Sequence, residues 1–69
     1  MTYNELVRRI RRLGFRYYSQ GKGSHEIWWL PGTERRSSIP RHAQREIATG
    51  TLKAILRDLG LSEDDLRNA

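Results

Sequence analysis

Residues 15–39, FRYYSQGKGSHEIWWLPGTERRSSI, decide the fold of this chain. Runs rich in aromatic and β-branched residues at 15–19, 25–30 and 35–39 are typical of short strands. The segments between them, residues 20–24 and 31–34, carry the glycines, proline and polar side chains of turns. Pro40 follows the third run and cannot donate a hydrogen bond to a sheet, so it ends that strand. The stretch therefore predicts three antiparallel strands joined by two short turns.

A first helix is expected over residues 3–13, just before this sheet. Thr2 and Glu5 have the Thr-x-x-Glu spacing of a capping box at a helix start. The apolar residues that follow recur at helical spacing on one stripe: Leu6, Val7, Ile10 and Leu13. Gly14 stands where a glycine commonly ends a helix. Arginines occupy the rest of the circumference: Arg8, Arg9, Arg11 and Arg12.

A second helix is expected after the sheet. Gly50 and Thr51 precede a second apolar stripe of helical period, and Gly60 follows it as a stop. The stripe consists of Leu52, Ile55, Leu56 and Leu59. Residues 62–65 resemble another helix cap, with room for one or two turns. The order is α-β-β-β-α, an α+β fold in which both helices cover one face of a three-stranded antiparallel sheet. The other face stays open to solvent or a ligand.

Length and composition narrow the classes of function. The 69 residues allow one small domain, and the absence of cysteine excludes disulfides and thiolate metal sites. Residues 1–57 carry twelve basic and four acidic side chains, whereas residues 58–69 carry one basic and four acidic. This imbalance favours a polyanion binder over a merely solvated basic surface. No apolar run is long enough to span a membrane, and arginines interrupt the N-terminal segment that a signal peptide would need. We therefore expect a cytoplasmic protein without a membrane partner.

Three ordered pieces of sequence resemble a known family. They are Gly23-Ser24-His25 at a strand start, Ile39-Pro40-Arg41-His42, and GTLKAIL at residues 50–56 followed by Gly60-Leu61. With the first helix and its Gly14-Phe15 ending, the chain resembles the HicA toxins, the mRNA interferases of HicA–HicB toxin–antitoxin pairs. The resemblance covers nearly the whole chain and implies a single HicA-like toxin domain over residues 1–69 with a double-stranded-RNA-binding-like fold.

The resemblance also implies an activity and a partner. The activity is that of a type II toxin, an endoribonuclease that cleaves mRNA without a metal cofactor and so inhibits translation and growth. His25 of the Gly-Ser-His motif would be the essential residue. The partner would be a HicB-type antitoxin that covers the active site. The two distant histidines and scattered acids of this chain have no metal-ligand spacing of their own, so we expect no metal and no cofactor.

The residues alone support part of this chemistry. His25 and His42 are the two histidines, and a histidine titrates near neutral pH, which suits proton transfer. RNA supplies its own nucleophile, the 2′-hydroxyl. We expect the His25 ring at a sheet edge near the turn, as general acid or base; the alternative is a solvated or capping histidine. His42 is expected to pack or hydrogen-bond in the loop before the second helix, with a second catalytic histidine as the alternative.

Several residues are candidates for RNA and phosphate binding. Lys22 lies three residues before His25 in the turn, where a cation can hold the scissile phosphate. Gly21 and Gly23 allow the loop backbone to approach the phosphate, although ordinary turn geometry is the favoured interpretation of both. Ser24 can orient the histidine or donate to the phosphate. Further cations are candidate clamps for backbone phosphates: Arg35, Arg36 and Arg41. Alternation places Arg35 and Arg36 on opposite faces, so the two are not expected to serve one site.

The adjacent Trp28 and Trp29 must also point to opposite faces of the sheet. One belongs to the core, and the other is a base-stacking platform or an antitoxin contact on the open face; the sequence leaves open which is which. His25, Ile27 and Trp29 share one side, so an exposed His25 would expose Ile27 unless a twist or bulge intervenes. Two other functions remain open: a non-catalytic RNA-binding module of the same fold, and a pure protein-interaction domain.

Overall fold

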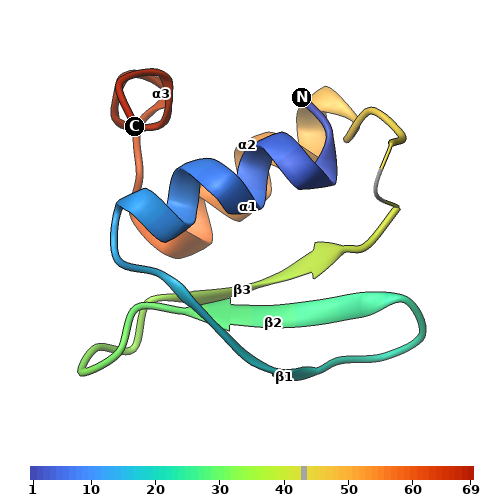
Figure 1. The fold of residues 1–69 in the computed structure, drawn as a ribbon, viewed down its shortest axis with the longest axis horizontal. Helices are drawn as coiled ribbons and strands as arrows, with labels where there is room; N and C mark the ends of the chain where they lie inside the picture. The colour runs from blue at the N-terminus through green and yellow to red at the C-terminus, as the bar shows by residue number, and fades with distance from the viewer. Residues whose placement is uncertain (43) are drawn as a thin grey trace.

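The computed structural model describes residues 1–42 and 44–69, and Figure 1 shows its fold. The helices are α1 (Tyr3–Arg12), α2 (Thr49–Leu59) and α3 (Glu63–Arg67). The strands are β1 (Arg16–Gln20), β2 (His25–Trp29) and β3 (Arg36–Pro40). Within the described residues, none of the helices has the length and apolar character that crossing a membrane requires.

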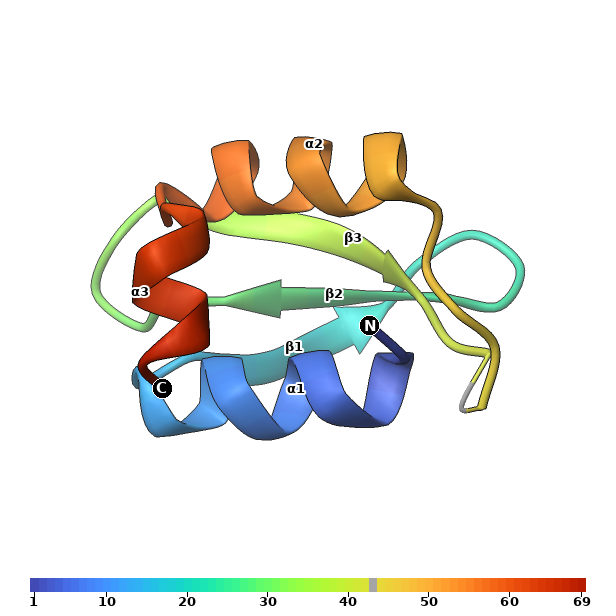
Figure 2. The ribbon, with the colours of Figure 1, turned by 90° about the horizontal axis from the view of Figure 1, so that it is seen from above.

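The molecule has two layers. The three strands form an antiparallel sheet in the order β1-β2-β3, with β2 in the centre. All three helices lie on one side of this sheet, so its other face is left open (Figure 1). Seen from above, α1 runs along the β1 side and α2 along the β3 side, while α3 lies across one end (Figure 2). The predicted α-β-β-β-α order with helices on one face is confirmed, and α3 follows it.

The helix ends follow from local chemistry. The Thr2 hydroxyl accepts a hydrogen bond from the Glu5 backbone N–H at 3.2 Å and caps α1. Gly60 ends α2 in the left-handed conformation, with φ of 70°. Ser62 and Asp65 form a full capping box at the start of α3. The hydrogen bonds from Ser62 lower the pKa of the Asp65 carboxyl. The start of α2 differs from the predicted one: the helix begins at Thr49, so Gly50 lies inside its first turn.

The core lies between the helices and the inner face of the sheet. Its largest fully buried side chains are Trp28, Phe15, Leu6, Ile10, Ile39 and Leu59. Trp28 is 1% exposed, which answers the question that alternation left open: Trp28 packs under the helices, and Trp29 belongs to the open face. The burial of Trp28 anchors β2, the central strand, and so fixes which side chains of that strand face solvent.

Arg9 and Arg11 of α1 contact other parts of the protein. Arg9 Nη1 donates to the Leu66 carbonyl at 3.2 Å and the Arg67 carbonyl at 3.1 Å, and so holds the end of α3. The Arg11 guanidinium lies 5.1 Å from the ring centroid of Trp28, a cation–π contact. These two side chains are therefore directed at the protein itself.

Candidate nucleic-acid interface on the open sheet face

The open face carries the side chains of β2 that alternate with its buried ones. His25, Ile27 and Trp29 lie on this face, while Glu26 and Trp28 are buried on the helix side. Simple alternation therefore holds, and Ile27 does lie on the open face. It is only partly exposed because the turn before β2 folds onto it: a Cβ built on Gly21 would lie 3.4 Å from Ile27 Cδ1. No twist or bulge of β2 is needed to present His25.

His25 is exposed at the start of the central strand. The order of the sheet corrects the expected position at an edge: two short turns place the second strand between the other two, so His25 pairs with Pro40 of β3. Its Nδ1 and the Ser38 hydroxyl oxygen form a hydrogen bond of 2.9 Å. The Nε2 atom has no hydrogen bond within the described part of the chain. The ring is thus held at one nitrogen and presented to solvent at the other.

The turn before His25 is stiffened by hydrogen bonds. Gln20 Nε2 donates to the Gly23 carbonyl at 3.0 Å and to the His25 carbonyl at 2.9 Å. The His25 backbone N–H donates to the Lys22 carbonyl at 3.0 Å. Gly23 has φ of +60° with no atom within 4 Å of a built Cβ, so it is required for its backbone angle rather than for space. The turn holds the exposed Lys22 three residues from the histidine.

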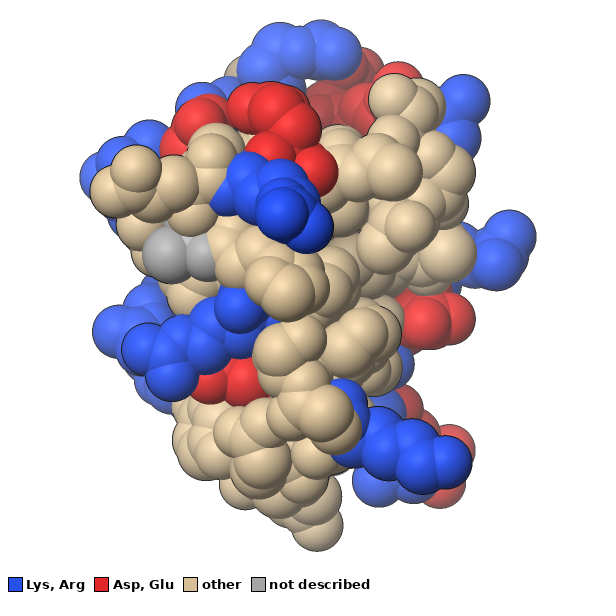
Figure 3. Space-filling model, turned by 90° about the vertical axis from the view of Figure 1, so that its right-hand side faces the viewer, with Lys and Arg blue, Asp and Glu red and all other residues tan. Residues whose placement is uncertain are grey.

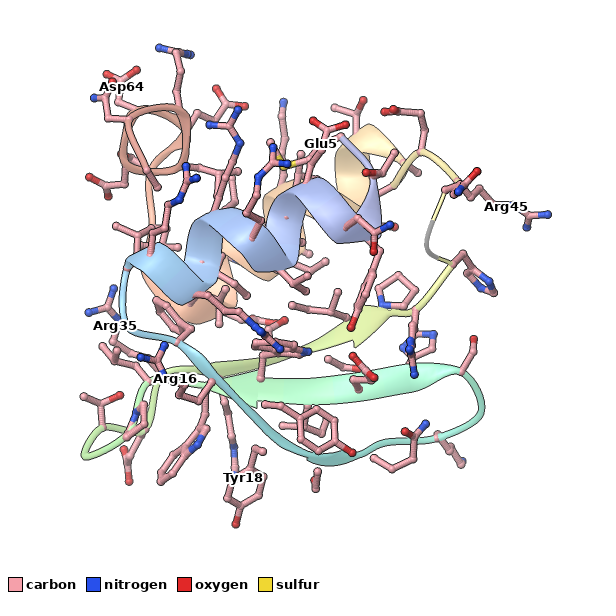
Figure 4. The ribbon with its side chains drawn as sticks, in the orientation of Figure 1. Glu5, Arg16, Tyr18, Arg35, Arg45 and Asp64 are labelled. Atoms are coloured by element: carbon pink, nitrogen blue, oxygen red, sulfur yellow. The ribbon has the colours of Figure 1, made fainter. Side chains whose placement is uncertain are left out.

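The loop after β3 meets this turn. The Arg41 backbone N–H donates to the Ser24 carbonyl at 2.9 Å. The Ser24 hydroxyl and His42 Nε2 lie 3.3 Å apart in a hydrogen bond. The second histidine, which the sequence separates from the first by a whole strand, is therefore beside the Gly-Ser-His turn. Arg45, further along the loop, points away from the molecule (Figure 4).

The structure separates the three candidate arginines. Arg36 pairs with Trp29 across the sheet and lies on the open face, at the opposite end from His25. Arg41 lies beside the Gly-Ser-His turn. Arg35 points to the helix side, as alternation predicts, where Nε donates to the Leu59 carbonyl at 2.7 Å. The guanidinium of Arg35 thus caps the end of α2 and does not join the open face.

Comparison with known families identifies the chain. The family model described as the HicA toxin of bacterial toxin–antitoxin matches residues 3–61, from the start of α1 to just beyond α2. The chain belongs to the HicA toxin family. Membership makes it a toxin-type domain and implies an antitoxin partner of the HicB type. No curated protein matched the chain.

A buried carboxylate in this HicA-family chain was not foreseen. Glu26 is 5% exposed, and it accepts hydrogen bonds from the Tyr3 hydroxyl and, at 3.1 Å, from Trp28 Nε1. Arg41 Nη1 lies 3.6 Å from its other oxygen. Burial, the hydrogen bond to Glu26 and the charge of that carboxylate raise the pKa of Tyr3 to about 12. The sequence did contain a sign of this burial, because Glu26 and Trp28 are two residues apart on one strand and therefore point to the same face.

This network ties the site to the helices. It joins the first turn of α1 to the first residues of β2, and through Arg41 it reaches the loop that carries His42. Figure 3 views this end of the molecule and shows Lys and Arg side chains projecting at several separate points, with acidic groups between them. The positive charge is thus distributed in small groups, and the position of each cation matters more than the total.

Proposed function

We propose that this HicA-family toxin is an endoribonuclease that cleaves mRNA with His25 as its proton-transfer residue. The observation that carries the proposal is the geometry of the His25 ring. The side chain of His25 is exposed, its Nδ1 is held 2.9 Å from the Ser38 oxygen, and its Nε2 has no hydrogen-bond partner among the described residues. A histidine oriented through one nitrogen and available at the other is the arrangement that general acid–base catalysis uses.

The hydrogen bond to Ser38 is compatible with both proton-transfer roles. If His25 Nδ1 carries the proton and donates it to the Ser38 oxygen, Nε2 is a base that takes the proton of the RNA 2′-hydroxyl. If the ring is an imidazolium, both nitrogens carry a proton: Nδ1 donates a hydrogen bond to the Ser38 oxygen, and Nε2 gives its proton to the leaving 5′-oxygen and becomes neutral. In either case the 2′-oxygen bonds to phosphorus, the bond from phosphorus to the 5′-oxygen breaks, and Nε2 is the reacting atom of the enzyme.

The turn residues hold the phosphate in this proposal. Lys22 and the Ser24 hydroxyl lie on either side of Gly23, whose missing side chain lets the RNA backbone approach the loop. Arg41 adds a cation at the same end of the sheet, and Arg36 binds a more distant phosphate. Arg35 is left out because its guanidinium already bonds the end of α2. The extra charge of the phosphorane transition state would be met by the cations nearest His25.

The proposal also covers the extent of the domain and its partner. Residues 1–69 form one unit, because Leu66 of α3 is 4% exposed and packs into the same core as α1 and α2. A HicB-type antitoxin would silence the toxin in the cytoplasm by covering the open face around His25. An acidic partner surface would suit the net charge of +5.

The decisive experiment is cleavage of a long single-stranded RNA in the presence of EDTA. We expect the wild-type protein to cut and His25→Ala to lose at least 100-fold in rate, the lower end of what proton transfer contributes. His42→Ala is the matched control, since it removes the same ring from the neighbouring loop, and it is expected to keep cutting. Cleavage by His25→Ala at the wild-type rate would overturn the assignment, and dependence on an added divalent ion would overturn the metal-free mechanism.

A non-catalytic RNA-binding module is the second candidate. It is favoured by the aromatic pair on the open face, the exposed Tyr18 and the partly buried Trp29, which lies away from His25 and suits binding without chemistry. Under this alternative the wild-type protein binds RNA and never cuts it, and His25→Ala binds equally well.

A further inference from the structure

We propose that Tyr18, Trp29, Glu34 and Arg36 form a nucleobase-binding subsite that gives this toxin a preference for an amino-bearing base, cytosine above uracil. The inference rests on the proposed function for the identity of the ligand, RNA. It adds a specificity site at the opposite end of the open face from His25.

An aromatic pair forms the floor of the subsite. The ring centroids of Tyr18 and Trp29 lie 5.0 Å apart at an interplanar angle of 59°. Tyr18 is 52% exposed and points away from the helices (Figure 4). The register between β1 and β2 shifts between Tyr17 and Ser19, so Tyr18 is an extra residue in the ladder, a bulge. Bulges re-aim side chains beside functional sites, and this one places a second aromatic ring beside Trp29.

A hollow of about 390 Å³ opens beside these rings. Its walls are Tyr18, Trp29, Thr33, Glu34 and Arg36. This volume lies within the range of small-ligand pockets. The sheet fixes the positions of Tyr18, Trp29 and Arg36, which come from β1, β2 and β3, and the turn between β2 and β3 supplies Thr33 and Glu34.

The polar walls select the chemistry of the ligand. The hollow holds one carboxylate, Glu34, and one guanidinium, Arg36, and among the described residues neither forms a hydrogen bond or ion pair with another side chain. A carboxylate repels phosphate and accepts from N–H donors, as Asp and Glu do from the cytosine 4-amino group. A guanidinium stacks on a base or binds the adjoining phosphate. The combination fits a nucleotide whose base stacks on Trp29 and donates to Glu34.

The subsite lies on the same strand and face as the reacting histidine. His25 and Trp29 are the first and last residues of β2, and four steps at roughly 3.3 Å per residue separate them by about 13 Å. One strand of RNA can thus occupy both points. A single-stranded stretch is required, because only unpaired bases can stack on side chains and present their pairing edges.

Binding of short RNAs tests the subsite separately from cleavage. The experiment uses oligocytidine and oligouridine with a fluorescent end label, and every protein carries His25→Ala so that the RNA stays intact. Tyr18→Ala is expected to weaken binding roughly 5- to 100-fold, the effect of losing one base stack. Tyr17→Ala is the matched control: that ring is equally exposed, at 48%, but lies edge-on to Trp28 on the helix side. The Tyr17→Ala variant should bind RNA as tightly as the protein that carries His25→Ala alone.

Glu34→Gln tests the preference for the base. The amide can turn its N–H group toward the base, so it no longer disfavours the uracil oxygen. We expect the affinity ratio of oligocytidine to oligouridine to fall toward one, while Glu34→Gln keeps its total affinity within a few-fold.

Two results overturn the subsite without touching the nuclease. In the first, Tyr18→Ala binds both RNAs as tightly as Tyr17→Ala does. In the second, Tyr18→Ala loses affinity for the antitoxin alone, which would make the aromatic pair a protein contact. Conversely, a Tyr18-dependent affinity in a protein that never cuts RNA would support the subsite and refute the proposed chemistry.

Discussion

Replacing Glu26 is expected to destabilise the protein strongly. The carboxylate is buried and accepts hydrogen bonds from Tyr3 and Trp28, with Arg41 at 3.6 Å. Glu26→Ala would leave two buried donors and one cation without their acceptor. Leaving a buried donor without its acceptor costs about 1–3 kcal/mol, so the two donors together account for roughly 2–6 kcal/mol. Arg41 is 64% exposed and can be solvated instead. A chain of this length has a total stability of roughly 3.5–10 kcal/mol.

The measurement is urea unfolding followed by far-UV circular dichroism. With a slope of roughly 1 kcal/mol/M for so small a domain, Glu26→Ala would move the midpoint down by about 3 M or unfold the protein outright. Glu26→Gln keeps an acceptor of nearly the same shape and is expected to cost about 1–2 kcal/mol. It therefore provides a measurable midpoint where the alanine variant does not.

Glu34→Ala is the control, because Glu34 is an exposed glutamate for which a change within about 0.5 kcal/mol is expected. Equal midpoints for Glu26→Gln and Glu34→Ala would refute the structural role given to Glu26. Wild-type stability of Glu26→Ala would refute it too, since the buried donors would then find water or other partners at no cost.

Three further outcomes follow from single contacts. Folding raises the pKa of Tyr3 from 10.0 to about 12. The contribution of Tyr3 to the free energy of unfolding is therefore constant below pH 10 and falls between pH 10 and 12, by at most about 1.4 kcal/mol per pH unit. In the Tyr3→Phe variant, the urea midpoint should no longer show this fall between pH 10 and 12. Gly60→Ala should destabilise more than Gly32→Ala in the same assay. Both have positive φ, but only at Gly60 would the new methyl lie 2.9 Å from the guanidinium that caps α2. Ser38→Ala should slow RNA cleavage roughly 10-fold, which is less than the 10²–10⁴-fold contribution of proton transfer itself. It should also shift the pH profile of cleavage, because the His25 tautomer is no longer fixed. Ser38→Thr should restore the rate and the pH profile.

The fold was predictable because its signals are local and agree with one another. Two apolar stripes of helical period, three short strands and two glycine-containing turns leave few arrangements, and a meander with both helices on one face is the simplest. The start of α2 was less clear. Gly50 suggested a boundary, yet it lies inside the first turn because Ala48 and Thr49 already begin the helix without a capping side chain.

The site was predictable only where it lies on one strand. Alternation along β2 correctly separates His25 and Trp29 from Glu26 and Trp28. Contacts between strands need the register, which the sequence does not contain. The hydrogen bond of His25 to Ser38, 13 residues away, depends on how β3 pairs with β2.

The positive charge of the chain has two separate uses, and this explains why composition overstates the binding surface. Arg9 and Arg35 neutralise the carbonyl ends of helices, where a cation complements the helix dipole. Arg11 covers the buried Trp28. A domain of this size has too little apolar surface to dispense with such contacts. Two of the cations that stay exposed lie near opposite ends of β2: Lys22 in the turn before His25, and Arg36, which pairs with Trp29. RNA recognition by this face therefore depends on the spacing between two points along β2 rather than on a continuous basic patch.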